Sequence, residues 1–211
     1  KEAPPHPLSR FSRDEMEEKL REPGQLPAYR YRFYDAFRKE EPLWAGLGWE
    51  NQLIRLRYEY LLEETDGFLH DWFSFELDLR NILVAWNCRR HELALSGQLI
   101  GENEVTGALS RSHTRDFGLS NDHPYVDRLL NAMESDDILQ REKTIDHIKW
   151  DFIEASNTFH YFTLEVVLGY LLKLMMLERR LRLDPEAGRV AVDRCIRTLE
   201  KEALKLVKKP V

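Results

Sequence analysis

The sequence has little cysteine: only Cys88 and Cys195 occur in 211 residues. Each lies within an expected helix, and the two are too far apart in sequence to form a Cys-x-x-Cys motif. This usage excludes a small disulfide-stapled scaffold and is typical of a protein from a reducing compartment. We therefore predict two buried, free thiols.

Motifs of known catalytic chemistry are also missing. There is no Walker A loop, Gly-x-Gly-x-x-Gly, Gly-x-Ser-x-Gly or His-Glu-x-x-His motif. The sequence therefore gives no support for a phosphate-binding loop, a serine nucleophile on a strand-to-helix turn, or a zinc-binding helix. His147 and Asp151 lie four residues apart, but a zinc site needs three or four ligands, and a surface pair is the simpler interpretation. Ser110, His113 and Asp116 lie close in a loop, which is not triad geometry. We predict no catalytic residue, no metal site, no cofactor and no enzyme activity.

The chain has no excess of positive charge and no long apolar run. Its formal net charge is −6, with acids and bases interspersed, whereas nucleic-acid-binding domains are typically basic in clusters. No stretch reaches the ~18 apolar residues of a membrane span, and no signal peptide is visible. The sequence therefore predicts a cytoplasmic protein with no nucleic-acid partner and no direct membrane span. It does not begin with Met, which leaves open a longer natural protein.

What the sequence does contain is helical periodicity along most of its length. Apolar residues recur at steps of three and four, and no convincing period-two alternation occurs. We predict an all-α fold, an elongated multi-helix bundle with the possibility of two similar helical subdomains. The expected parts are a Pro-rich disordered lead (1–11), a first helical subdomain (12–95), an irregular connection (96–123) and a second subdomain (124–211). One continuous domain is the alternative.

Two helices dominate this pattern. Phe68–Leu95 carries a seam of large apolar residues, which predicts packing against a neighbouring helix. In the stretch Phe159–Leu183, with Thr163 as the expected N-cap, residues from Tyr161 to Leu177 place apolar side chains on every side of a helical wheel, which is typical of a central core helix. We therefore expect the other helices to pack around this late segment. Those helices are expected from Pro27 to Glu41, Trp49 to Glu64, Pro124 to Met133, after Asp136 to Asn157, and Pro185 to Val207, with short turns at Glu104–Leu109.

Charged residues in these helices admit two interpretations. Glu165 and Lys173 lie eight residues apart in the most apolar segment, so they share one side of a helix. That side either reaches solvent, as the rarity of buried charge favours, or forms a polar lining that meets another subunit. Arg89 and Arg90 end the earlier helix, where positive charge complements the helix dipole without any ligand.

The two dominant segments resemble a known family. Glu76–Leu93, with the sequence ELDLRNILVAWNCRRHEL, resembles a segment of the C-type subunits of V/A-type rotary ATPases (the d-type subunits of vacuolar ATPases). In that segment a D-x-x-N-I/L signature leads into a run ending in basic residues. In this sequence those positions are held by Asp78, Asn81, Ile82, Arg89 and Arg90. The late segment is similar to that family's V-L-x-Y-L-x-K-x-x-E-x-R pattern, with Glu178 displaced. The matching residues are Val167, Leu168, Tyr170, Leu171, Lys173 and Arg179.

The chain looks still more like a bacterial family of unknown function, which itself resembles a divergent C-type subunit. The resemblance implies a non-catalytic helical part that couples the central stalk to the membrane rotor ring during proton or sodium transport. It implies other components of the V/A-type ATPase as partners, and a position peripheral to the inner membrane through the complex. The alternatives are a helical adaptor or assembly factor, and an enzyme whose site the sequence does not reveal. The candidate partner contacts, or polar lining, are Asp78, Asn81, Arg89, Arg90, Glu165 and Lys173.

Overall fold

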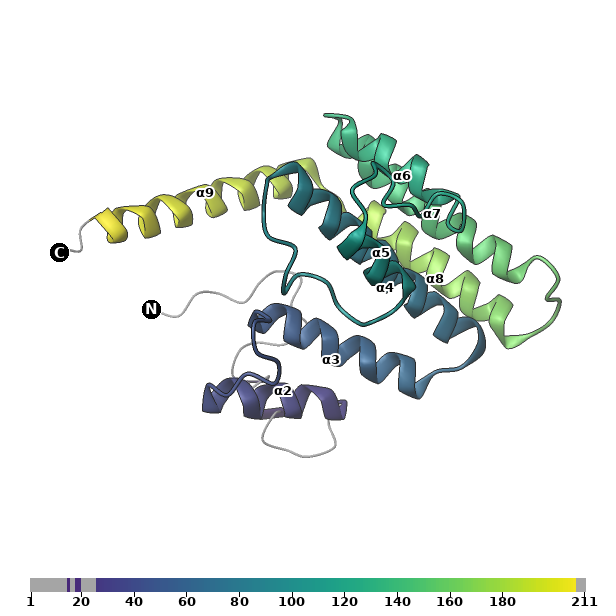
Figure 1. The fold of residues 1–211 in the computed structure, drawn as a ribbon, viewed down its shortest axis with the longest axis horizontal. Helices are drawn as coiled ribbons and strands as arrows, with labels where there is room; N and C mark the ends of the chain where they lie inside the picture. The colour runs from purple at the N-terminus through teal and green to yellow at the C-terminus, as the bar shows by residue number, and fades with distance from the viewer. Residues whose placement is uncertain (1–14, 16–17, 20–25, 208–211) are drawn as a thin grey trace. The chain divides into compact units, whose positions relative to one another are not determined.

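The computed structural model describes residue 15, residues 18–19 and residues 26–207, with side chains up to Glu200. These residues contain α-helices and turns but no β-strand, so the predicted all-α class is confirmed. The predicted Pro-rich lead (1–11) lies outside the described residues. Figure 1 shows the helices, which are α2 (Ala28–Lys39), α3 (Trp49–Glu64), α4 (Gly67–Arg90), α5 (Glu104–Arg111), α6 (Tyr125–Glu134), α7 (Ile138–Asn157), α8 (Leu164–Leu181) and α9 (Pro185–Val207).

Most helices begin and end near their predicted limits, and α3 and α9 have the expected bounds. The exception is α4, which ends at Arg90 rather than at Leu95. Glu92 adopts a left-handed φ of 54°, and the N–H of Leu93 donates to the carbonyl of Cys88 at 2.8 Å. This closure satisfies a terminal carbonyl group and turns the chain out of the helix.

The chain forms two compact units, residues 1–148 and residues 149–211. The first contains α2 to α6 and the start of α7, and the second contains the end of α7, α8 and α9. The predicted subdomain limits (12–95, 96–123 and 124–211) stay a prediction.

α4 supplies much of the buried core of the first unit. Ile82 is 0% exposed and Leu79 is 2% exposed, and Phe68, Trp72 and Phe75 are also buried. These residues follow one another at steps of four and three, so this part of the predicted seam is confirmed. In Figure 1, α3 lies between α2 and α4, and the three helices follow one another as antiparallel neighbours.

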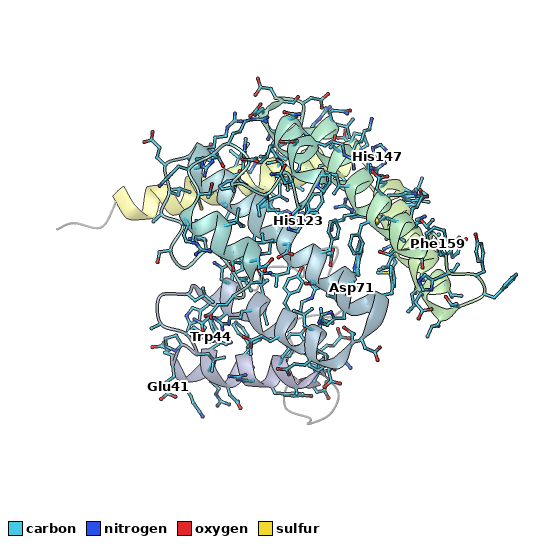
Figure 2. The ribbon with its side chains drawn as sticks, turned by 45° about the vertical axis from the view of Figure 1, so that its right-hand side comes forward. Glu41, Trp44, Asp71, His123, His147 and Phe159 are labelled. Atoms are coloured by element: carbon cyan, nitrogen blue, oxygen red, sulfur yellow. The ribbon has the colours of Figure 1, made fainter. Side chains whose placement is uncertain are left out.

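The turn between α2 and α3 is held by Gln52, which is buried at 1% exposure. The side-chain amide of Gln52 donates to the carbonyl of Leu47 at 2.7 Å, and its oxygen accepts from the N–H of Leu43 at 2.8 Å. The guanidinium of Arg55 lies 4.4 Å from the ring centroid of Trp44, which Figure 2 labels. These contacts fix the turn to the first half of α3.

The prediction that Phe159–Leu183 is the central core helix is wrong. α8 begins at Leu164, and its only buried residue is Gly169. Large apolar side chains elsewhere on α8 are exposed, among them Tyr170 at 68% and Leu174 at 47%. The physical reason is that apolar residues all round a helix do not determine how many of its sides find a partner within the chain.

The two cysteines lie in different environments, and both are free. Cys88 is buried in α4, as predicted, whereas Cys195 is exposed on α9, so the prediction of two buried thiols is wrong for the second. Cys195 is exposed because α9 buries none of its described side chains: every one from Pro185 to Glu200 is exposed.

Candidate interaction surface

α8 presents a broad apolar stripe to solvent. Val167, Tyr170, Leu174, Leu177 and Leu181 recur at steps of three and four, and their exposures range from 45% to 85%. This spacing is the one with which a helix packs along another helix. A contiguous exposed apolar surface marks an interaction site in a soluble protein. We call this surface the α8 face and define it as Leu164, Val167, Tyr170, Leu171, Leu174, Met175, Leu177 and Leu181.

Another side of α8 packs against α7, and this packing fixes the direction of the α8 face. Gly169 is buried at the contact. A Cβ atom added to Gly169 would lie 2.9 Å from Cγ2 of Ile153, and it would also collide with the side-chain amide of Asn157. A residue without a side chain is therefore needed for the two helices to approach so closely.

A polar triad links the same two helices. Lys173 Nζ lies 3.0 Å from Glu154 Oε1, and the indole N–H of Trp150 donates to the same oxygen at 2.7 Å. The ammonium of Lys173 also lies 4.7 Å from the Trp150 ring centroid. The hydrogen bond from Lys173 and then that from Trp150 lower the pKa of the Glu154 carboxyl. Lys173 therefore pairs with α7. Glu165 is half-buried in the first turn of α8. A polar lining formed by these two residues stays a prediction.

Exposed apolar residues continue on both sides of α8 in the sequence. Phe159, Tyr161 and Phe162 are exposed in the turn before the helix, and Figure 2 shows Phe159 at this turn. α9 carries an exposed apolar stripe at Val192, Ile196 and Leu199. None of the helices in the described part of the chain is long and apolar enough to cross a membrane. The exposed apolar residues of α8, of the turn before it and of α9 together mark the candidate interaction surface of the second unit.

Asp78 and Asn81, the D-x-x-N pair, hold the segment that follows α4. The amide of the fully buried Asn81 donates to the carbonyl of Ile100 at 2.8 Å, and its oxygen accepts from the N–H of Ile100 at 3.1 Å. Asp78 accepts from the amide of Asn103 at 2.7 Å, and Asn103 in turn caps α5 with Thr106 in a capping box. Burial raises the pKa of Asp78, and the bond from Asn103 opposes this rise. The pair therefore attaches α5 to α4.

Arg89 and Arg90 also contact later parts of the first unit. Arg89 donates to the carbonyl of Thr114 at 2.5 Å, and its guanidinium lies 3.9 Å from the ring centroid of Phe117. Arg90 donates to the carbonyl of Met133, the penultimate residue of α6, at 3.4 Å. The predicted role of these arginines and of the D-x-x-N pair in binding a partner stays a prediction.

Ser110 and Asp116, two of the remaining candidates, form local hydrogen bonds. Ser110 donates to the carbonyl of Thr106 at 2.8 Å, within its own helix. Asp116 accepts from the N–H of Gly118 and from the hydroxyl of Thr114, and these bonds lower the pKa of Asp116 to about 2. Among the residues that the structure describes, no group of three or more His, Cys, Asp or Glu could hold a metal ion.

Comparison with known families decides the family of this chain. The model of the family described as "Protein of unknown function (DUF2764)" matches residues 1–203. The chain belongs to this family. Neither a curated protein nor a solved structure matches the chain. Membership of a family of unknown function is therefore shown, while the resemblance of this DUF2764 protein to the C-type ATPase subunits stays a prediction from its two helical motifs.

Reasoning from the sequence missed the α8 face of this DUF2764 protein. A signal was present, because Gly169 and Lys173 lie four residues apart and therefore on one side of the helix. A residue without a side chain marks a close helix contact, and a lysine on the same side can reach an acid of the neighbouring helix. The two together indicate a helix that packs on that side and leaves its large apolar residues to another partner.

Proposed function

We propose that this DUF2764 protein is a non-catalytic helical component of a V/A-type rotary ATPase, similar to the C-type subunits, between the central stalk and the rotor ring. One observation supports the proposal most strongly. The α8 face contains part of the second motif, in Leu164–Leu183, that resembles the C-type subunits. Val167, Tyr170 and Leu171 belong to both. α8 packs against α7 on one side and exposes an apolar stripe on another, and such a stripe can bind a helix of a partner protein.

The packing of the first unit is consistent with a part that transmits force. α4 is 24 residues long, and Asn81 and Arg89 tie it to backbone carbonyl groups 19 and 25 residues further along the chain. Closely packed helices are poorly compressible, which a coupling element needs. A passive scaffold would be built in the same way, so the identity of the partners is the deciding measurement.

On this proposal the protein resides at the cytoplasmic side of the inner membrane, where the complex holds it, and takes part in proton or sodium transport without binding the ion. Its partner surface would be partly apolar, as the cores of stable protein interfaces are. The α8 face supplies such a surface, and the exposed stripe of α9 supplies a second one.

Co-purification of tagged protein from a host that contains a V/A-type ATPase tests the proposal. We expect stalk or rotor-ring subunits to accompany the wild type and to be lost with the double variant Tyr170→Glu, Leu174→Glu. His113→Glu, at an exposed position in the first unit, is the matched control and should retain them. Recovery of proteins that are absent from the finished ATPase would identify an adaptor or assembly factor instead. Repeated failure of the wild type to recover any part of the ATPase would overturn the proposal.

A further inference from the structure

A groove between α2 and α3 belongs to the first unit and is independent of the α8 face. Its volume is about 530 Å³. Tyr29 and Phe33 of α2 and Leu53 and Ile54 of α3 give it an apolar lining. A groove between two helices with such a lining can receive the apolar side chains of a third helix.

Two arginines line the same groove, Arg30 from α2 and Arg57 from α3. Arg30 Nε donates to the hydroxyl of its neighbour Tyr29 at 3.2 Å, and the guanidinium of Arg57 lies 5.8 Å from the Tyr58 ring centroid. Neither arginine forms an ion pair with any residue that the structure describes.

The sequence explains why Arg30 and Arg57 have no ion-pair partner on their own helices. No acid lies three or four residues before or after Arg30 or Arg57, so neither helix offers an ion-pair partner one turn away. Arg55 shows the contrast on the same helix, because its guanidinium pairs with Glu59, four residues later, at 2.8 Å. The groove thus combines an apolar lining with two guanidinium groups that have no carboxylate among the described residues.

We propose that this groove binds an acidic amphipathic helix of another protein. Apolar side chains spaced three or four residues apart would enter the groove, and Asp or Glu beside them would pair with Arg30 and Arg57. Guanidinium groups match carboxylates because they present parallel N–H donors. The whole chain has a formal charge of −6 and does not attract an acidic partner at long range. Recognition therefore depends on these two local cations.

Two synthetic peptides of about 15 residues, the length at which isolated helices become populated, provide the probe. Both carry leucines spaced three and four residues apart; one has glutamates beside them and the other has lysines. Fluorescence anisotropy with the full chain should show binding of the acidic peptide, weakened by salt, and binding of the basic peptide at least about tenfold weaker. Arg30→Gln and Arg57→Gln should each lower the affinity for the acidic peptide about tenfold.

The control is the double variant Arg189→Gln, Arg194→Gln, which removes two positive charges from exposed positions on α9, one more than either groove variant removes. It should bind the acidic peptide as the wild type does. Urea unfolding should give nearly the same midpoint for wild type and groove variants, because Arg30 and Arg57 form no ion pair with a described residue and lose only the contacts with their neighbours Tyr29 and Tyr58. Failure of the acidic peptide to bind, equal binding of the basic peptide, or equal loss in the α9 control would overturn the proposal.

Discussion

α4 and α8 are the two most apolar helices of the chain, and they use their apolar residues in opposite ways. α4 buries a full stripe of large side chains, whereas α8 buries only Gly169. Their polar residues differ as well: Asn81 of α4 binds the backbone of a distant segment, while Lys173 of α8 pairs with the adjacent helix. A long apolar helix becomes core when later segments of the chain return to cover it. Otherwise its apolar side remains available to a partner.

The largest expected effect comes from removing one leucine from each helix. Leu79 is 2% exposed and Leu174 is 47% exposed. Leu79→Ala should lower the free energy of unfolding by about 2–5 kcal/mol, because it leaves a cavity in a packed core. Leu174→Ala should change it by about 0.5 kcal/mol or less. Urea unfolding followed by circular dichroism measures both, and equal losses would remove the contrast between the two helices.

A second pair of variants concerns the polar residues of α4. Asn81→Ala leaves the buried N–H and carbonyl of Ile100 without their partners, and we expect a loss of about 2–4 kcal/mol in the free energy of unfolding. Asn87→Ala on the same helix is the control, since the Asn87 side chain is exposed and its amide donates to the carbonyl of Leu83 within α4. Both changes gain the same helix propensity, so their difference reports the contacts of the Asn81 side chain. These are the two hydrogen bonds with Ile100 and a longer one, at 3.2 Å, that Arg80 donates to the Asn81 oxygen. A difference below about 1 kcal/mol would show that this contact does not hold the segment.

The third comparison uses two glycines of the second unit. Replacing them with alanine should change the free energy of unfolding in opposite directions. Gly169→Ala places a Cβ atom 2.9 Å from Ile153. The overpacking costs about 1–3 kcal/mol and outweighs the helix propensity gained, so we expect a net loss of about 1 kcal/mol. Gly188 of α9 has no atom within 4 Å of an added Cβ. Gly188→Ala should therefore stabilise the helix by about 0.5–1 kcal/mol. Thermal unfolding of both variants measures the direction of each change in stability. A stabilising effect of Gly169→Ala would contradict the close packing of α7 and α8.

The helices could be predicted from the sequence because their signals are local. Asp184 shows this at the start of α9, where its carboxylate accepts from the N–H of Glu186 at 2.8 Å. The site could be predicted only in part, because its decisive contacts join residues far apart in sequence. Asn81 and Lys173 are both recognisable as polar residues in apolar helices, yet the partner of each lies 19 residues away. No helical spacing rule reaches that far, and so the sequence alone could not determine which side of α8 is covered.

The smallest expected effect concerns the ion pair between α7 and α8. The pKa of Glu154 lies below its ordinary value of 4.5, owing first to the hydrogen bond from Lys173. A carboxyl whose pKa is lower in the folded state stabilises the fold above its unfolded pKa, and this contribution is lost as the pH falls through the folded pKa. Glu154→Gln removes the charge and keeps an oxygen that can accept from Trp150. The urea midpoint of this variant should lie slightly below that of the wild type near pH 7, and the difference should shrink as the pH falls below 4.5.

Salt should reduce the difference near pH 7, since the Glu154 side chain is exposed. Glu63→Gln, at an exposed position of α3, removes the same charge and controls for the change in net charge. A difference between Glu154→Gln and wild type that does not shrink as the pH falls cannot come from an ionised carboxylate. In that case the packing around Gly169, rather than the ion pair, would orient α8 and determine which of its residues form the α8 face.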